Sequence, residues 1–293
     1  MKLLPTKSAL LHLRFMFSLF LLPVFVFALS QAPEVSSWSA FLVFVVWHFF
    51  VYPASNGYNS YFDKDEGSIA LIEKPPAVDK SLYNFSLLLE GIGVLLALLV
   101  SLEFAMAAVL YGVLSKMYSH PSVRLKAHPY LSFLVVFIFQ GAFIYWASYA
   151  AISELSLAQS WSYPNIVAGL TCSCLIGASY PLTQVYQHEE DLKRGDRTLS
   201  LVLGVKGTFV FAGCLFALGC GLMFHYWELQ HTTVYFWLFL VFVLPVMFVF
   251  LKWLIRSWKD RHNANFKFMS KMTMVSGLAM LGYFLTILIL RLL

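Results

Sequence analysis

Two segments of the sequence carry carboxylates and amides at matched positions. The first spans Tyr52–Gly67 and the second spans Tyr180–Gly195. Tyr, Pro, Ser or Thr, Asn or Gln, Tyr, Asn or Gln, Asp and Gly recur in the same order without a gap, so we interpret the segments as copies of one internal repeat. The matched oxygen-bearing pairs include Asn56 with Gln184, Asn59 with Gln187, and Asp63 with Asp191.

Acidic side chains are dense in and after both copies. They are Asp63, Asp65, Glu66, Glu73 and Asp79 in the first region, and Glu189, Glu190, Asp191 and Asp196 in the second. Mg²⁺ prefers oxygen ligands, and it is usually held by few carboxylates together with substrate phosphates. The two regions therefore indicate a magnesium site. The alternative is a pair of solvated loops whose acids offset nearby lysines.

The spacing places these polar residues on helices. They advance by three or four positions, which is the spacing of one helical face. A polar stripe would be costly against lipid, so each stripe is expected to line a cavity. The stripes are His48, Tyr52, Asn56, Asn59 and Asp63 in the first helix, and Tyr180, Gln184, Gln187 and Asp191 in the second. Two roles stay open for His48, orienting an acceptor or packing through a hydrogen bond.

Two further features bear on a charged site. The segment Tyr118–Lys126 contains Arg124 and Lys126, which can bind phosphate as a fork and as a point charge. The alternative is ordinary basic charge beside a membrane. Glu90 lies inside an apolar stretch, where an ionisable group is costly. It lines the cavity, faces a lateral opening or pairs with a neighbour.

The composition predicts an integral membrane protein. The chain is 60% hydrophobic and only 12% charged, with a mean hydropathy of +0.74. A soluble domain usually carries about 25% charged residues. The formal net charge of +5 does not indicate nucleic-acid binding, because the Lys and Arg residues follow the predicted membrane spans. The cysteines are expected to be small packing residues; they are Cys172, Cys174, Cys214 and Cys220.

Stretches of about 20 apolar residues predict the spans. They are Leu10–Leu29, Trp38–Ala54, Tyr130–Ala151, Trp161–Leu182, Gly207–Tyr226, Thr233–Leu254 and Met272–Leu290, with Ser81–Met117 long enough for two short spans broken near Ser101–Glu103. Nine spans with an inner N-terminus put every Lys and Arg except Arg291 on one face, whereas eight would move more than half of them across. The positive-inside rule therefore favours nine, with the acidic loops cytoplasmic. A cleaved signal peptide ending near Ser30 is the alternative for the first span.

The residues in these segments resemble the motifs of the UbiA superfamily of intramembrane prenyltransferases. That family carries Asn-Asp-x-x-Asp-x-x-x-Asp after helix two, and Asn59–Gly67 is similar to it. It carries Asp-x-x-x-Asp-x-Lys-x-Gly-x-x-Thr after helix six, and Gln187–Thr198 is similar to that. The family loop Tyr-Ser-x-Pro-Pro-x-Arg-x-Lys after helix four resembles Tyr118–Lys126, with Ser122 in place of the second Pro.

The resemblance implies a single all-α domain over residues 1–293, with nine transmembrane helices around a central cavity and a four-helix pseudo-repeat. It places the motif loops at residues 55–80, 116–129 and 187–206. It implies Mg²⁺-dependent transfer of a prenyl group from an allylic prenyl diphosphate to an aromatic or other lipid-precursor acceptor. By this resemblance Asp63, Asp191 and Asn59 are catalytic and hold Mg²⁺ with Glu190, while Arg124, Lys126, Lys193 and Tyr118 bind the diphosphate.

The motifs also depart from the family pattern. Ser60, Gly67 and Gln187 stand where many members have Asp, and the acids expected to compensate are Asp65, Glu66, Glu189 and Glu190. Two other functions therefore stay open, a membrane transporter and a relative that binds isoprenoid diphosphates without turnover. The expected partners are a prenyl diphosphate, an unidentified acceptor and membrane lipid, with neither nucleic acid nor an obligatory protein partner.

Overall fold

The fold is all-helical in the computed structural model, which describes residues 5–64, 67–69 and 72–293. No strand is found in these ranges, and this confirms the predicted fold class. The longer helices are α3 (Leu22–Gln31), α4 (Ser37–Val45), α5 (Tyr52–Asp63), α6 (Lys80–Leu98), α7 (Leu102–Ser119), α8 (Pro129–Val136), α9 (Phe143–Ile152), α10 (Tyr163–Ser179), α12 (Leu199–Leu229), α13 (Val234–Lys259) and α14 (Phe266–Leu292). Shorter pieces are α1 (Lys7–His12), α2 (Phe15–Ser18), η2 (Leu125–Ala127), η4 (Pro181–Thr183), α11 (His188–Arg194) and η5 (Arg261–Asn263).

Eight helical segments in the described ranges are long and apolar enough to cross a membrane. Two of them contain a π-helical turn, η1 (Val46–Val51) between α4 and α5 and η3 (Phe137–Ala142) between α8 and α9. In α13, only 17% of the most apolar stretch of the helix is buried inside the protein, so most of this stretch faces lipid. The chain is thus a multi-pass integral membrane protein.

The long stretch Ser81–Met117 forms two helices, as its length predicts. Helix α6 ends at Leu98, and Ser101 caps α7 by accepting a hydrogen bond from the backbone N–H of Phe104 at 3.0 Å. Such caps satisfy the free N–H groups of a new helix, so the chain reverses here. Helix α7 carries Glu103 and Lys116 in its end turns and is not one of the eight candidate spans. A count of nine spans stays a prediction.

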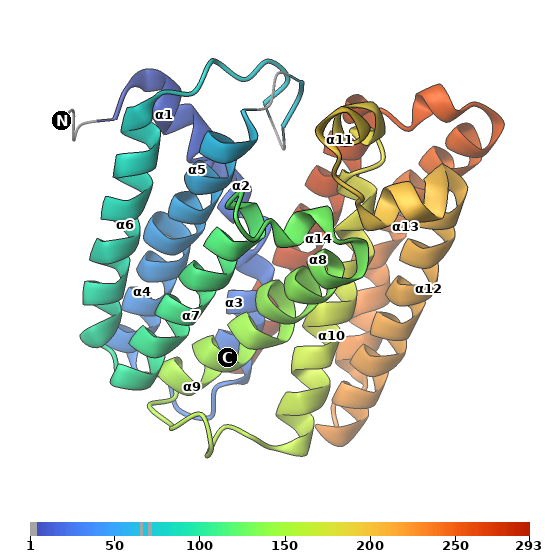
Figure 1. Ribbon diagram of the computed structural model, residues 1–293. Helices are drawn as coiled ribbons and strands as arrows, with labels where there is room; N and C mark the ends of the chain where they lie inside the picture. Colours follow the sequence, from blue (N-terminus) through green and yellow to red (C-terminus); the bar gives the residue numbers. More distant parts are fainter. Residues whose placement is uncertain (1–4, 65–66, 70–71) are drawn as a thin grey trace.

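The two ends of the chain close the bundle. Helices α5, α6 and α7 pack in succession, as do α10, α12, α13 and α14, and α14 packs against α3. Helix α3 also contacts α9. Figure 1 shows the N-terminus, α11 and the turn between α13 and α14 at one end of the bundle, which we call the motif end.

Aromatic side chains fill the opposite half of the bundle. Phe27 stacks on Phe284 with ring centroids 4.5 Å apart and contacts Tyr145 at 5.2 Å. Trp227 donates a hydrogen bond to the Tyr283 hydroxyl at 2.7 Å. These contacts make this half a densely packed aromatic core.

The two copies of the repeat differ in local structure. The first is continuous helix, since α5 runs through Pro53 to Asp63 after the π-helical turn η1. In the second, α10 ends at Ser179, Pro181 opens the short turn η4, and α11 starts only at His188. The expected single helical face from Tyr180 to Asp191 is therefore wrong. Pro181 lacks the N–H needed to continue α10, which accounts for the break.

Helix packing at η3 predicts a sensitive glycine. A Cβ on Gly141 would lie 2.6 Å from the backbone nitrogen of Ser173 in α10, so the two helices would have to separate. We expect Gly141→Ala to lower the free energy of unfolding by about 1–3 kcal/mol, seen as a lower thermal midpoint in detergent. Gly91→Ala is the matched control, since nothing lies within 4 Å of a Cβ there. Equal midpoints for both variants would contradict this packing.

Candidate active site

A cavity of about 330 Å³ opens at the motif end and is lined by both copies of the repeat. Helices α5 and α7 supply one wall, and α10, the segment after it and α14 supply the other. Of the residues singled out from the sequence, those lining it are Asn56, Asn59, Asp63, Tyr118, Lys126, Tyr180, Gln184, Gln187, Asp191 and Asp196. The two motifs and the basic loop thus converge on one space.

Asp63 enters the cavity because α5 ends there. Lys64 adopts a left-handed conformation with φ 50°, and its N–H bonds to the carbonyl of Ser60 at 3.0 Å, which stops the helix. The carboxylate of Asp63 forms an ion pair with the ammonium of Lys126. Both side chains are nearly buried, so each charge depends on the other for compensation.

The basic loop is anchored by Asp196. Arg124 donates two hydrogen bonds to its carboxylate, from Nε at 2.8 Å and from Nη2 at 2.9 Å. The Lys126 ammonium lies 3.9 Å from Oδ2 of the same carboxylate. The Arg124 bond to Asp196 raises the pKa of the guanidinium further. Asp196 therefore holds both cations of the loop.

Asp191 reaches the cavity from the opposite side to Asp63. It lies in α11, which ends at Gly195 with φ 76°, a left-handed conformation that glycine adopts without strain. The N–H of Asp196 donates to the Asp191 carbonyl at 2.9 Å, and the Thr198 hydroxyl donates to its carboxylate at 3.3 Å. Burial, and next the charge of Asp196, raise the pKa of Asp191 to about 6.

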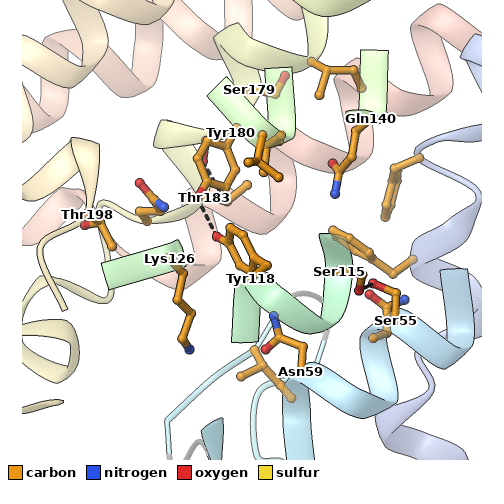
Figure 2. A pocket seen from close by; sticks show the side chains of 18 of the residues that line it. Ser55, Asn59, Ser115, Tyr118, Lys126, Gln140, Ser179, Tyr180, Thr183 and Thr198 are labelled. Atoms are coloured by element: carbon orange, nitrogen blue, oxygen red, sulfur yellow. Dashed lines mark hydrogen bonds between the residues drawn. The ribbon is translucent and has the colours of Figure 1, made fainter. Parts of the chain in front are cut away.

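Two tyrosines join the walls above the charged groups. The hydroxyls of Tyr118 in α7 and Tyr180 at the end of α10 lie 2.6 Å apart (Figure 2). The side chains of Asn59 and Lys126 approach the space beside Tyr118 from different elements in the same view. The hydroxyl pair thus links α7 to the start of the second copy of the repeat.

A second set of polar groups lines the cavity without charge. The hydroxyls of Ser55 and Ser115 are hydrogen-bonded to each other, and Gln140 projects from η3 (Figure 2). Apolar side chains also line the cavity, among them Leu114, Val136, Phe139 and Ile176. The cavity therefore has a charged mouth, an apolar wall and a neutral hydrogen-bonding region.

The other residues singled out from the sequence lie outside this lining. Glu190 pairs with Arg194, Lys193 is exposed, and Glu90 pairs with Lys116 across α6 and α7. The ring of His48 contacts the carbonyl of Ser18 at 3.1 Å, and Tyr52 stacks on Trp47 in the aromatic core. Asp65 and Glu66 lie outside the described residues. The Glu190 carboxylate lies 2.8 Å from where a Cβ of Gly67 would be.

Sequence reasoning gave Asp196 no role at the site. It is 3% exposed and lines the cavity, and its carboxylate contacts both bases of the loop after α7. Its only signal in the sequence is membership of the second acidic cluster. Arg14, Gln140 and Arg194 also line the cavity, and their spacing in the sequence gives no sign of it.

The donor atoms at the mouth fit a magnesium–diphosphate complex better than a metal held by protein alone. Among the described residues, no three His, Cys, Asp or Glu side chains gather closely enough to hold an ion. Mg²⁺ needs no such cage, since one or two carboxylates and substrate phosphates suffice. Asp63, Asp191 and Asn59 supply hard oxygen donors from two sides of the mouth.

Solved structures share this fold. A UbiA homolog from Archaeoglobus fulgidus bound to GPP and Mg²⁺ is 17% identical with a TM-score of 0.68, covering 96% of this chain and 99% of its own. A UbiA homolog from Aeropyrum pernix K1 is 18% identical with a TM-score of 0.64, covering 92% and 98%. A digeranylgeranylglyceryl phosphate synthase is 18% identical with a TM-score of 0.61, covering 97% of both chains.

The sequence itself supplies the family assignment. No curated protein matches the chain at a significant level. The model of the UbiA prenyltransferase family matches residues 20–276, which include both copies of the repeat and the basic loop. This match covers most of the chain, and the protein therefore belongs to the UbiA prenyltransferase family.

Proposed function

We propose that the protein transfers a prenyl group from an allylic prenyl diphosphate to an acceptor within the membrane, with Mg²⁺ as cofactor. The observation that carries this is the convergence of Asp63, Asp191 and Lys126 on the mouth of one cavity. Related structures from Archaeoglobus fulgidus are bound to Mg²⁺ with GPP or with DMAPP, which supports the same substrate class here. The acceptor is an aromatic ring or another lipid precursor.

The diphosphate would bind at the charged mouth. Asp63, Asp191 and Asn59 would hold Mg²⁺ together with the phosphate oxygens, and the metal would stabilise negative charge on the leaving group. Lys126 is the cation of the basic loop that lines the cavity and would reach the phosphates, and the Tyr118 hydroxyl lies beside it. Arg124 would act from its position on Asp196. Glu190 and Lys193, outside the cavity lining, would contribute charge from the rim.

The prenyl tail would lie along the apolar wall. Bond cleavage between the allylic carbon and the diphosphate oxygen releases diphosphate and leaves an electron-poor carbon. The acceptor attacks that carbon, forms the new bond and then loses a proton. Ser55, Ser115 and Gln140 would orient the acceptor through hydrogen bonds. A wall of Leu114, Val136 and Phe139 limits capture of the reactive carbon by water.

The membrane orientation follows from charge. We infer that the motif end faces the cytoplasm, because every Lys and Arg except Arg291 falls on that side in the nine-span arrangement. Prenyl diphosphates carry strongly hydrated charges, so access from the aqueous side at the mouth suits the substrate.

Removing either carboxylate tests the proposal. We expect Asp63→Ala and Asp191→Ala each to lower kcat at least about 100-fold, since each removes a ligand that stabilises developing charge. The assay supplies labelled GPP and Mg²⁺ to the detergent-purified chain with a lipid or quinone-precursor extract, and follows label in new lipids. Asp260→Ala is the control, an acid on the exposed turn before η5.

Three outcomes would count against this function. Wild-type turnover in both cavity variants would remove the metal assignment. GPP binding without product from any acceptor would instead identify a relative that binds isoprenoid diphosphates without turnover. Flux of a substrate into liposomes without prenyl transfer would identify a transporter.

The pKa of Asp191 predicts a pH dependence. Its carboxyl has a pKa of about 6, raised from 3.8 by burial and by Asp196, so it is largely protonated below pH 6. Protons then compete with Mg²⁺, and we expect Mg²⁺-dependent binding of GPP to weaken as pH falls through about 6. For the protein without ligand the sign is opposite, because a raised carboxyl pKa makes the folded state less stable as pH rises from about 4 to about 6. GPP titrations from pH 5 to 8 at two Mg²⁺ concentrations check this, and a midpoint insensitive to Mg²⁺ would contradict it.

A further inference from the structure

The ammonium of Lys126 lies among three carboxylates of the cavity mouth. It pairs with Asp63, it lies 3.9 Å from Oδ2 of Asp196, and its charge acts on Asp191. Lys126 is 8% exposed, so water does little to stabilise its charge. A buried charge needs a partner of opposite sign. Lys126 thus neutralises acids drawn from both copies of the repeat.

Asp196 fixes the backbone from which Lys126 extends. Two hydrogen bonds from Arg124 tie the carboxylate to the basic loop, and the backbone N–H of Arg197 approaches the carbonyl of Ala127 at 3.4 Å. On its other side Asp196 is bonded through its own N–H to Asp191. The loop is therefore held to the second acidic segment by the Arg124 side chain and by its backbone, independently of the Lys126 side chain.

We propose that Asp196 is a positioning residue for Lys126 and that the Lys126 ammonium neutralises Asp63 until it moves to a bound diphosphate. The divalent ion then binds tightly only together with the diphosphate. This inference rests on the proposed function and adds the order of binding at the same site.

The physical reason is competition between two cations for one carboxylate. While Lys126 pairs with Asp63, a divalent ion there would meet an ammonium at close range, and like charges repel strongly in a poorly hydrated site. Phosphate oxygens attract an ammonium as a point charge. When a diphosphate binds, the flexible lysine side chain can move to it, and the Asp63 carboxylate becomes available to the metal. Arg124 keeps Asp196 in place during this exchange.

Lys126→Gln separates this arrangement from a passive ion pair. The variant removes the competing ammonium, so we expect Mg²⁺ alone to bind the variant about tenfold more tightly than the wild type. A tenfold change is the size expected when one hydrogen bond to a charged group is lost. The detergent-purified full chain is titrated with Mg²⁺, and the shift in thermal midpoint gives the half-saturating concentration. An unchanged half-saturating concentration would overturn the proposal.

Asp196→Asn tests the positioning role. It keeps the size of the side chain but removes the charge that orients both cations. We expect inorganic pyrophosphate, at saturating free Mg²⁺, to bind about tenfold more weakly, with Asp196→Glu restoring part of the loss. A merely structural role would lower the midpoint without ligand and leave this affinity unchanged, which would overturn the proposal. Asp260→Asn is the control, an exposed acid on the turn before η5.

Titrations of the wild-type protein test the order of binding separately from prenyl transfer. The inference predicts that saturating pyrophosphate lowers the half-saturating free Mg²⁺ concentration at least about tenfold. Tight binding of pyrophosphate with no change in Mg²⁺ affinity would overturn the order of binding alone and leave prenyl transfer standing. No binding of pyrophosphate at any Mg²⁺ concentration would overturn both.

Discussion

The compensation of buried charge at the cavity mouth is the constraint on which the rest of the site depends. Lys126 pairs with Asp63 of the first acidic segment, and Asp196 of the second contacts both Lys126 and Arg124. Removing water from such a group is unfavourable unless each charge has a partner. The loops after α5, α7 and α10 are far apart in sequence, and these ion pairs give them a common reason to meet.

The position of the cavity follows from where aromatic side chains pack in the helix bundle. Aromatic residues occupy one half, with Phe27, Tyr145 and Phe284 among the most buried side chains. The cavity lies toward the motif end, where polar side chains such as Asn56, Ser115 and Gln140 form part of its lining. A substrate with a charged head and an apolar tail matches this order of surfaces, and that match links the packing to the family assignment.

Much of this was predictable from the sequence, for physical reasons that differ between features. The length of the apolar stretch and the placement of Lys and Arg predict the separate helices α6 and α7, and the repeat predicts that Asp63 and Asp191 share one cavity. Helical spacing failed for the second copy, because Pro181 ends α10 before the acids are reached. The partners of the ion pairs between segments could not be predicted from the sequence. Neither the contact of Arg124 with Asp196 nor that of Glu90 with Lys116 follows from the spacing of the residues along the chain.

The aromatic packing of the half opposite the motif end has a consequence for the membrane itself. An intramembrane chamber that admits diphosphate, metal and water from one side is a potential leak for ions and protons. Here the half of the bundle opposite the motif end is closed by aromatic rings such as those of Phe27 and Trp227, which are 0% and 1% exposed. An electrochemical gradient across the bilayer would thus fall over this apolar plug, and catalysis at the mouth need not discharge it.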